Sequence, residues 1–455
     1  MNIKSEIVQN VQFTCDAELY GRHVNEKMRR LLPLFTQTGY SSLVIASGEI
    51  KTHFQDDIQY CYKPNPYFKE WVPLNRRPGS FLQLKPGAHK PCLFLLCAED
   101  IWHTEPQSLP RGFSHYLEIV GYKTLEELTQ LLNLKGANSA YIGEANLLGL
   151  PQALCNPLTV LNYIDYHRRF KTVYEQFCVR EANRLAIPAH LAAQQTFMAG
   201  GSELQVCAAY LEACDSSESD MPYPVIAGIN EHAAVLHHFH LDRQKPKNFR
   251  SLLLDAGVDF RGYASDITRT YAFDPDSEFA EMIGVMDENQ LQLIAAGVVG
   301  KSPYDLHLLA HKKVAEVLIQ FGIITCSVDA AVQLRITDTF FPHGLGHHLG
   351  SSVHDKGSQL ASPRGDVLPP PEGYPTVRNT VPMVASQVYT VEPGLYFIPA
   401  LLDKLRKAET HRQVNWARIE DFVPFGGIRI EDNIIMHSNN ELENLTRDAF
   451  SHHSH

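Results

Sequence analysis

The sequence predicts two domains, an α/β domain over residues 1–165 and an α+β domain over residues 166–455. Three observations lead to this prediction. The chain has 455 residues, more than one domain usually holds. Short apolar runs are mixed with helical patterns in its first third. A long helical pattern then separates this part from a second one, in which helices and β-type segments follow one another.

In the first domain, short apolar runs bounded by polar residues predict buried strands. These runs are Ser42–Ser47, Pro91–Cys97 and Ala140–Gly143. Leucines at helical spacing predict a helix over Thr124–Leu134. Strands and helices are thus mixed along the chain, which is typical of an α/β domain.

The helical pattern of Leu158–Met198 is interpreted as a linking helix followed by the first helix of the second domain. Ser202 is expected to cap the next helix, because a serine side chain can accept a hydrogen bond from the first turn. Two more helices are expected, over Ser277–Ala296 and Ser302–Gly322. Clustered prolines predict that Gln359–Val377 is a loop.

Composition and charge narrow the class of protein. Lys and Arg number 40 against 51 for Asp and Glu, a net charge of −11, which argues against nucleic acid or an anionic membrane as a partner. No apolar run is long enough to span a bilayer, and no signal peptide is evident. The nine cysteines contain no C-x-x-C pair and are expected to be buried free thiols, which predicts a cytoplasmic protein.

Two aspartates are expected to face each other across a hairpin. Asp255 ends one strand-like run and Asp266 begins the next, with a turn near Phe260–Gly262 between them. Directly opposed residues of antiparallel strands share a face, so the two carboxylates would lie side by side. Because like charges repel, the pair predicts a cation between them.

Three histidines, His343, His347 and His354, lie in a glycine-rich run. The spacing of the first two would suit one face of a helix, but Gly344 and Gly346 argue against a helix. An extended segment whose backbone approaches another group is therefore expected. The residues alone leave open which of the three histidines binds a metal ion.

Two glutamates complete the set of candidates. Alternation places Thr390 and Glu392 on one face of a strand. In the run Gly426–Glu431, the side chains of Arg429 and Glu431 share one face, and Ile430 points to the other. Either glutamate by itself would be read as a surface residue.

Together these segments supply four carboxylates and at least one imidazole. Burying four like charges is too costly unless they are neutralised, and two divalent cations would balance them. An oxygen-rich set with an imidazole and no thiolate suits Mn, Fe or Co. Two ions about 3.5–4 Å apart can hold a bridging hydroxide, the nucleophile of a metal-dependent hydrolase.

The motifs D-x10-D, G-H-x6-H-D, E-P-G and R-I-E resemble those of the dinuclear metallopeptidases of the pita-bread fold, which include creatinase relatives, aminopeptidase P and prolidase. Within this group the chain resembles the bacterial prolidases, also through Asn230–His237 and Asn65–Pro73. The resemblance covers most of the chain. It implies that the α+β domain has the pita-bread fold.

The resemblance also implies a ligand set and a cofactor. The implied metal ligands are Asp255, Asp266, His347, Glu392 and Glu431. Asp266 and Glu431 would bridge two Mn²⁺ ions per subunit, with Co²⁺ or Fe²⁺ as alternatives. His347 fits better than His343, because it precedes His354 by seven residues, the interval found in the family.

Further residues match positions that act on the substrate. Glu392, His343, His354 and His237 match catalytic positions, and Tyr223 matches a pocket residue. The matching substrate-binding residue for the dipeptide's carboxylate is Arg378, with Arg429 next in line. Val381 stands where the family often has a second arginine.

The expected function is hydrolysis of dipeptides with a C-terminal proline through the metal-bridged hydroxide, with side hydrolysis of organophosphorus esters. The resemblance implies a homodimer in which Asp56 or Asp57 approaches the partner's pocket. An aminopeptidase P acting on longer peptides is one alternative, although Arg378 favours dipeptides. A binding protein on an inactive peptidase scaffold is another, although all five ligands are present.

Overall fold

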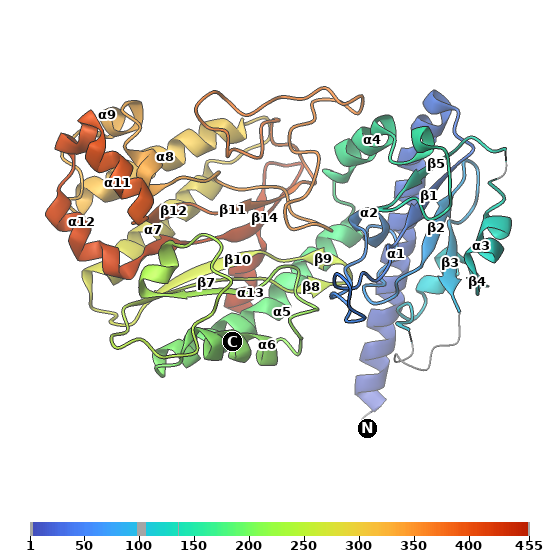
Figure 1. Ribbon diagram of the computed structural model, residues 1–455, viewed down its shortest axis with the longest axis horizontal. Coiled ribbons are helices and arrows are strands. Elements are labelled where there is room, and N and C mark those ends of the chain that lie inside the picture. Colours follow the sequence, from blue (N-terminus) through green and yellow to red (C-terminus); the bar gives the residue numbers. More distant parts are fainter. Residues whose placement is uncertain (1–2, 98–105, 135, 454–455) are drawn as a thin grey trace. The chain divides into compact units, whose positions relative to one another are not determined.

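The computed structural model describes residues 3–97, 106–134 and 136–453, and its chain divides into two units (Figure 1). Unit 1 contains Met1–Cys178, with Phe260–Tyr263 and Leu360–Val367. Unit 2 contains the rest: Val179–Asp259, Ala264–Gln359 and Leu368–His455. Each unit has its own sheet structure and its own apolar core.

Unit 1 is built on a five-stranded mixed sheet in the order β4-β3-β2-β1-β5. Its strands are β1 Ser42–Ala46, β2 Phe81–Leu84, β3 Cys92–Leu96, β4 Glu118–Tyr122 and β5 Ser139–Ile142. β1 pairs parallel with β5 and antiparallel with β2, and β3 pairs parallel with β4. The three strands expected from apolar runs are thereby confirmed as β1, β3 and β5, and the α/β class is confirmed.

The helices of unit 1 include one long element that was not predicted. They are α1 Ile3–Thr38, α2 Pro66–Lys69, α3 Leu125–Leu132 and α4 Leu158–Arg168, with short 3-10 turns at Phe113–Tyr116 and Gln152–Leu154. α3 confirms the helix expected from leucine spacing, and the Thr124 side chain caps it. α1 was not predicted, because many charged residues interrupt its apolar face. Tyr20, Val24 and Leu34 on this face are buried.

Unit 2 contains three small sheets. The strands are β6 Ile226–Ile229, β7 Ser251–Ala256, β8 Asp259–Phe260, β9 Tyr263–Ala264, β10 Ile267–Ala272, β11 Val388–Val391, β12 Gly394–Tyr396, β13 Gly427–Arg429, β14 Asp432–Met436 and β15 Leu442–Asn444, of which β8 and β9 form a short hairpin at the boundary with unit 1. The three sheets have the orders β10-β7-β6, β11-β14-β15 and β12-β13, and their pairings are antiparallel. A bridge between Thr268 and Glu431 joins β10 to the segment between β13 and β14.

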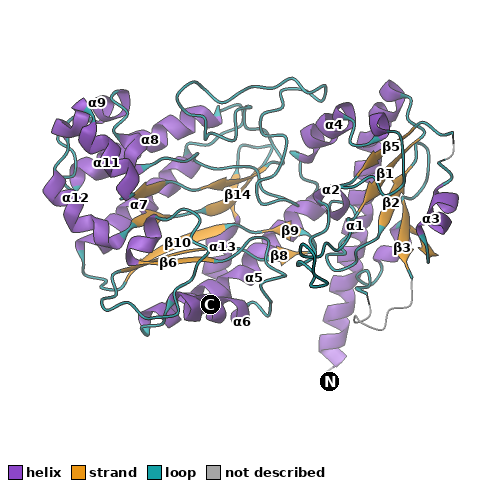
Figure 2. Ribbon diagram, in the orientation of Figure 1, coloured by secondary structure: helices purple, strands orange, loops and turns teal. Residues whose placement is uncertain are grey.

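Helices pack against these sheets in two groups (Figure 2). The helices of unit 2 are α5 Val173–Met198, which begins in unit 1, α6 Glu203–Ala213, α7 Glu278–Ala295, α8 Pro303–Gln320, α9 Val328–Gln333, α10 Thr337–Phe340, α11 Pro399–Lys407, α12 Trp416–Phe422 and α13 Leu445–His453, with 3-10 turns at Asn230–Ala234, Glu409–Gln413 and Val423–Phe425. One core joins α5 and α6 to β6 and β7, and a larger one joins α7 and α8 to β11 and β14. The α+β class is therefore confirmed.

The expected helices of the second domain are also confirmed. α4 and α5 divide the long helical pattern, and α7 and α8 fall where two later helices were expected. Ser202 caps α6 through a capping box with Gln205, so that two backbone donors at the helix start are satisfied. The proline-rich segment Gln359–Val377 is a loop, with a single bridge between Leu360 and Val367.

The strand register corrects the expected pairing of the two aspartates. Asp255 is directly opposite Thr268 in the β7–β10 pair, and Asp266 precedes β10. The turn lies at Arg261 and Gly262, which both have positive φ, as expected from its position near Phe260–Gly262. The prediction of direct opposition was wrong by two residues. Since two residues is one full side-chain repeat, both carboxylates still point to the same face.

Two further findings concern the cysteines and membranes. No disulfide joins cysteines within the described residues. Cys15, Cys61 and Cys97 are exposed, so the expectation that all the cysteines are buried was wrong for these three. In the part of the chain that the structure describes, every helix is too short or too polar to cross a bilayer.

Candidate metal centre

The candidate ligands lie where strands of unit 2 begin or end. Asp255 is in β7, Asp266 precedes β10, Glu392 follows β11, Glu431 separates β13 from β14, and His347 lies in the loop before β11. The bridge between Thr268 and Glu431 brings β10 beside this last glutamate, and a bridge between His348 and Tyr389 fixes the histidine loop on β11. Segments as much as 176 residues apart thus meet at one place.

Three of these side chains form a tight group. The ligand atoms of Asp266, His347 and Glu431 lie within 4.8 Å of one another, and all three residues are buried. His347 Nε2 is 3.3 Å from Asp266 Oδ2 and 3.6 Å from Glu392 Oε1. His347 Nδ1 lies 3.0 Å from the His348 carbonyl oxygen, to which it donates. This bond selects the tautomer whose Nε2 is available to a metal.

Asp255 belongs to the same cluster through shared partners. The Tyr223 hydroxyl oxygen is 2.8 Å from Asp255 Oδ1 and 2.5 Å from Asp266 Oδ1, so it joins the two carboxylates. Arg429 Nη2 donates to Asp255 Oδ2 over 2.6 Å. The expected proximity of the two aspartates is therefore found, although their register differs.

The electrostatics of the cluster show that its negative charge is in excess. Burial and the charges of the neighbouring carboxylates raise the pKa of Glu431 well above its usual value. Burial raises the pKa of Glu392 to about 7, even though His347 and Arg429 lower it. Burial also raises the pKa of Asp255, against the effect of Arg429. A divalent cation would remove this penalty, so the residues fit a metal site.

Two residues that sequence reasoning missed hold the cluster in place. The Thr268 hydroxyl donates to Glu431 Oε2 over 2.8 Å and accepts from Arg429 Nε over 3.1 Å. The Tyr396 hydroxyl accepts from Arg429 Nη1 over 3.0 Å. The sequence signal for Thr268 is its position two residues after Asp266 on the same strand face, whereas no local signal marks Tyr396.

The cluster lies in the wall of a cavity of about 450 Å³, a volume typical of small-molecule sites. All five candidate ligands line it, together with His237, His343, His354, Arg378 and Arg429. Tyr223 is not among the lining residues that the structure describes, and its hydroxyl contacts Asp255 and Asp266. Arg378 is exposed, and no side-chain hydrogen bond from it is found among the described residues.

His343 has a different environment from His347. Its Nε2 is 2.8 Å from the Tyr396 hydroxyl, its Nδ1 is 2.8 Å from the Gly344 carbonyl oxygen, and the nearest carboxylate, Glu392, is 3.7 Å away. Burial lowers the pKa of His343 to about 3, with Arg429 adding to the effect. The segment around it is not helical, as expected, and a Cβ atom at Gly346 would overlap the Thr390 carbonyl oxygen.

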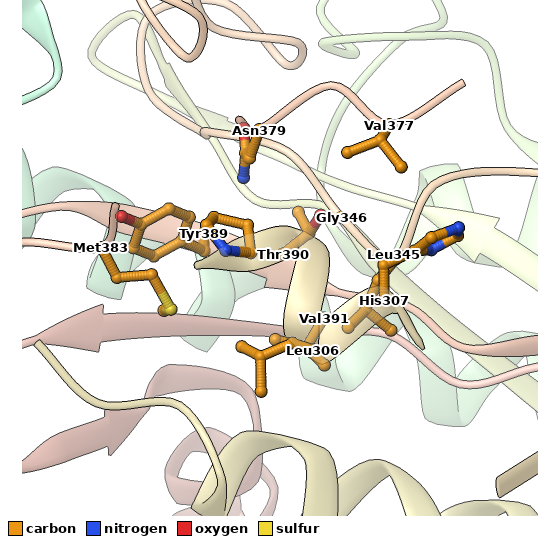
Figure 3. Close-up of a pocket in the computed structure, with 11 residues that line it drawn as sticks. Leu306, His307, Leu345, Gly346, Val377, Asn379, Met383, Tyr389, Thr390 and Val391 are labelled. Atoms are coloured by element: carbon orange, nitrogen blue, oxygen red, sulfur yellow. The ribbon is translucent and has the colours of Figure 1, made fainter. Parts of the chain in front are cut away.

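Figure 3 shows a second cavity, of about 40 Å³, which shares Gly346 and Val377 with the larger one. Most of its lining is apolar, and it also contains two buried polar atoms, His307 Nδ1 and Asn379 Oδ1, that have no hydrogen-bond partner among the described residues. The volume suits ordered water rather than a dipeptide. The larger cavity is therefore the candidate substrate site.

A buried set of carboxylates with one imidazole, in the wall of a cavity of this size, fits the active site of a metal-dependent hydrolase. The sequence profile of metallopeptidase family M24 matches residues 178–438, and that of the Xaa-Pro dipeptidase N-terminal domain matches residues 18–166. The chain belongs to metallopeptidase family M24.

Individual relatives agree with this assignment. The chain is 43% identical to a protein of Pseudoalteromonas translucida and 41% identical to one of Shewanella piezotolerans, over 95% of this chain and 98% of each relative. Both are named Xaa-Pro dipeptidase. Among solved structures, aminopeptidase P from E. coli in its low-pH form matches with a TM-score of 0.69 and 23% identity, and its complex with the inhibitor Pro-Leu with 0.71 and 22%, each over 94% of this chain and 95% of the other. These matches confirm the pita-bread fold.

Proposed function

We propose that this protein is an Xaa-Pro dipeptidase, which hydrolyses dipeptides with a C-terminal proline. The observation that carries the proposal is a single cavity lined both by the cluster of carboxylates and His347 and by the exposed guanidinium of Arg378. The first would hold the catalytic metal, and the second would bind the free carboxylate of a dipeptide. The names of the relatives support the same substrate class.

The proposed metal ligands are the five residues predicted from the sequence, Asp255, Asp266, His347, Glu392 and Glu431, with Asp266 and Glu431 shared between two ions. An oxygen-rich set with one imidazole favours Mn²⁺, with Co²⁺ or Fe²⁺ as alternatives. When bound, two divalent cations would supply Lewis acidity at the scissile carbonyl and the bridging hydroxide predicted from the sequence.

The remaining residues are assigned to binding, orientation and proton transfer. Glu392, which lines the cavity beside His347, would accept a proton from the attacking water and return it to the leaving proline nitrogen. His343, held by Tyr396, and the exposed His237 and His354 would contact the substrate. Tyr223 holds the two aspartates, and Arg429 holds Asp255 and Tyr396 and is second in line for the substrate carboxylate.

Three substrates test the proposed specificity on the Mn²⁺-loaded protein. Ala-Pro should be cleaved efficiently, whereas Ala-Pro-amide lacks the terminal charge and Ala-Pro-Gly places it one residue further away. We expect the ratio kcat/KM to fall strongly for both. Equal or faster cleavage of Ala-Pro-Gly would instead identify an aminopeptidase P acting on longer peptides.

The variant Arg378→Ala tests the carboxylate clamp. Loss of a charged hydrogen bond costs about 1.5–3 kcal/mol, so kcat/KM for Ala-Pro should fall by about 10- to 150-fold. The loss for Ala-Pro-amide should be much smaller, because it has no carboxylate to bind. Arg364→Ala is a matched control, since Arg364 is an exposed arginine of the same loop that does not line the cavity. If both substrates lose activity equally, the role proposed for Arg378 is wrong.

We also propose a homodimer, in which Asp56 or Asp57 approaches the pocket of the partner subunit. Both aspartates lie in an exposed segment that carries the apolar side chains of Phe54 and Ile58, which are 89% and 59% exposed. Exposed apolar side chains of this size favour an interface. Light scattering should give twice the mass of the 51.2 kDa chain, and Phe54→Asp should shift it toward the monomer. Leu158→Asp, at an exposed leucine at the start of α4, is the control, and a fully active monomeric wild type would exclude the proposal.

A further proposal is side hydrolysis of organophosphorus esters, because the same nucleophile can attack phosphorus. A p-nitrophenyl phosphotriester should release nitrophenol with the loaded enzyme, and Asp266→Asn should abolish this activity together with that on Ala-Pro. Activity that survives in the variant would come from another site.

We further propose a cytoplasmic location, and a domain boundary between residues 165 and 166.

A further inference from the structure

A second group of metal-binding side chains lies outside the candidate substrate cavity. It consists of Glu203, His232 and His238, whose ligand atoms lie within 4.8 Å of one another. Glu203 is the first residue of α6, His232 lies in the 3-10 turn Asn230–Ala234, and His238 follows that turn. None of the three lines the cavity that holds Asp266 and His347.

Both oxygens of the Glu203 carboxylate are fully used as acceptors. Oε1 accepts from the Ile229 backbone N–H over 2.9 Å and from His232 Nδ1 over 2.8 Å. Oε2 accepts from the Asp242 backbone N–H over 2.8 Å and from His238 Nε2 over 2.7 Å. Burial alone would raise the pKa of Glu203, but these hydrogen bonds, led by that of His238, lower it overall. The carboxylate is therefore charged at neutral pH.

This buried charge has no permanent cationic partner. No Lys or Arg among the described residues forms an ion pair with Glu203, and its two ion-pair partners are His232 and His238. The Glu203 side chain is only 2% exposed. Within the described part of the chain, the negative charge is therefore compensated by hydrogen bonds alone. Two imidazoles and one carboxylate are also a donor set that Zn²⁺ uses in proteins.

We propose that Glu203, His232 and His238 bind one Zn²⁺ ion, distinct from the proposed dinuclear centre. Zinc bonds of about 2.0–2.2 Å in a tetrahedron place ligand atoms about 3.3–3.6 Å apart, which lies between the present hydrogen-bond lengths and 4.8 Å. Small rotations of the two rings reach this geometry. The His232 side chain is 36% exposed, so the ion can enter from solvent. A water molecule can then take the fourth coordination position of the zinc.

The consequence of binding follows from the position of the site. The ion would join the start of α6 to the segment that runs from Ile229 to Asp242. His237, which lines the substrate cavity, lies in this segment next to His238. Zinc at this site would therefore stiffen the part of the chain that presents His237 to the substrate. The inference does not depend on which peptide the cavity accepts.

Zinc binding to the Mn²⁺-loaded protein tests the proposal. Zn²⁺ is added in equivalents against a chromogenic chelator, and the Mn²⁺ content is measured in the same samples to detect exchange at the other centre. We expect wild type to bind one more Zn²⁺ per chain than His232→Asn or His238→Asn. His240→Asn, at an exposed histidine outside the group, should bind as much as wild type.

Anomalous diffraction at the zinc edge then locates the ion. Crystals of the Mn²⁺-loaded wild type to which Zn²⁺ has been added should show a zinc peak about 2.0–2.2 Å from the three ligand atoms. A peak only at Asp266 and His347, or equal zinc binding by wild type and His232→Asn with Mn²⁺ retained, would overturn the proposal. Because His232 is partly exposed, its replacement leaves the core intact and keeps the comparison decisive.

Discussion

Asp266→Asn is expected to reduce the activity on Ala-Pro by about three orders of magnitude or more. The Asp266 carboxylate is buried, lies 3.3 Å from His347 Nε2, and is proposed to bridge both metal ions. An amide of the same shape removes one of the four negative charges and replaces one oxygen by a donor group. If the metal ions no longer stabilise the transition state, several kcal/mol are lost. At about 1.36 kcal/mol per tenfold change in rate, this loss corresponds to the expected three orders of magnitude.

The measurement is kcat/KM together with elemental analysis. Wild type loaded with Mn²⁺ should approach two ions per chain, and Asp266→Asn should hold clearly fewer. Asp276→Asn, at an exposed position before α7, should match wild type in both. One ion per chain in a fully active wild type would contradict the dinuclear site.

The same variant separates loss of metal from loss of fold. In the metal-free protein the charge of Asp266 helps to raise the pKa values of Asp255 and Glu431, after burial itself. Removing that charge reduces the repulsion within the cluster. The metal-free variant should therefore unfold at a temperature no lower than that of metal-free wild type, whereas a damaged fold would unfold earlier.

The second large effect is expected to distinguish His347 from His343. His347→Ala should lose at least about half of the bound Mn²⁺, because Nε2 of this residue faces the carboxylates and metal binding depends on each ligand. His343→Ala should keep its metal, because the two nitrogens of His343 contact Tyr396 and the Gly344 carbonyl group. Its kcat should fall by about 100-fold, because His343 is proposed to contact the substrate.

Each variant serves as the control for the other, because the two histidines lie in one glycine-rich loop and both line the cavity. Metal content and kcat are measured on the same preparations. The opposite pattern, with metal lost in His343→Ala and kept in His347→Ala, would show that the ligand assignment is wrong.

Much of the fold followed from local patterns. The strands β1, β3 and β5, the helices α3, α7 and α8, and the Ser202 cap were all predicted, because apolar periodicity and capping act over a few residues. The α1 helix was not, since its apolar stripe is interrupted by charges. Its burial depends on residues such as Phe113, which stacks on Tyr20, 93 residues earlier in the chain.

The candidate site was predicted in its residue types but not in its geometry. The family resemblance implied five ligand positions, and the structure places all five around one cavity. The register of Asp255 against Thr268 was not predictable, because a turn of uncertain length decides it. The contact of the Tyr223 hydroxyl with both aspartates was not predictable from the sequence either.

The sequence by itself determined the family, the two-part organisation, and the excess of carboxylates that calls for divalent cations. Only the tertiary structure decided how these charges are held. Thr268 and Tyr396 reach Arg429 from 161 and 33 residues away, and Glu203 meets His238 across 35 residues. The physical reason is that hydrogen bonds and charge pairs depend on distances of about 3 Å in space, which sequence separation does not encode.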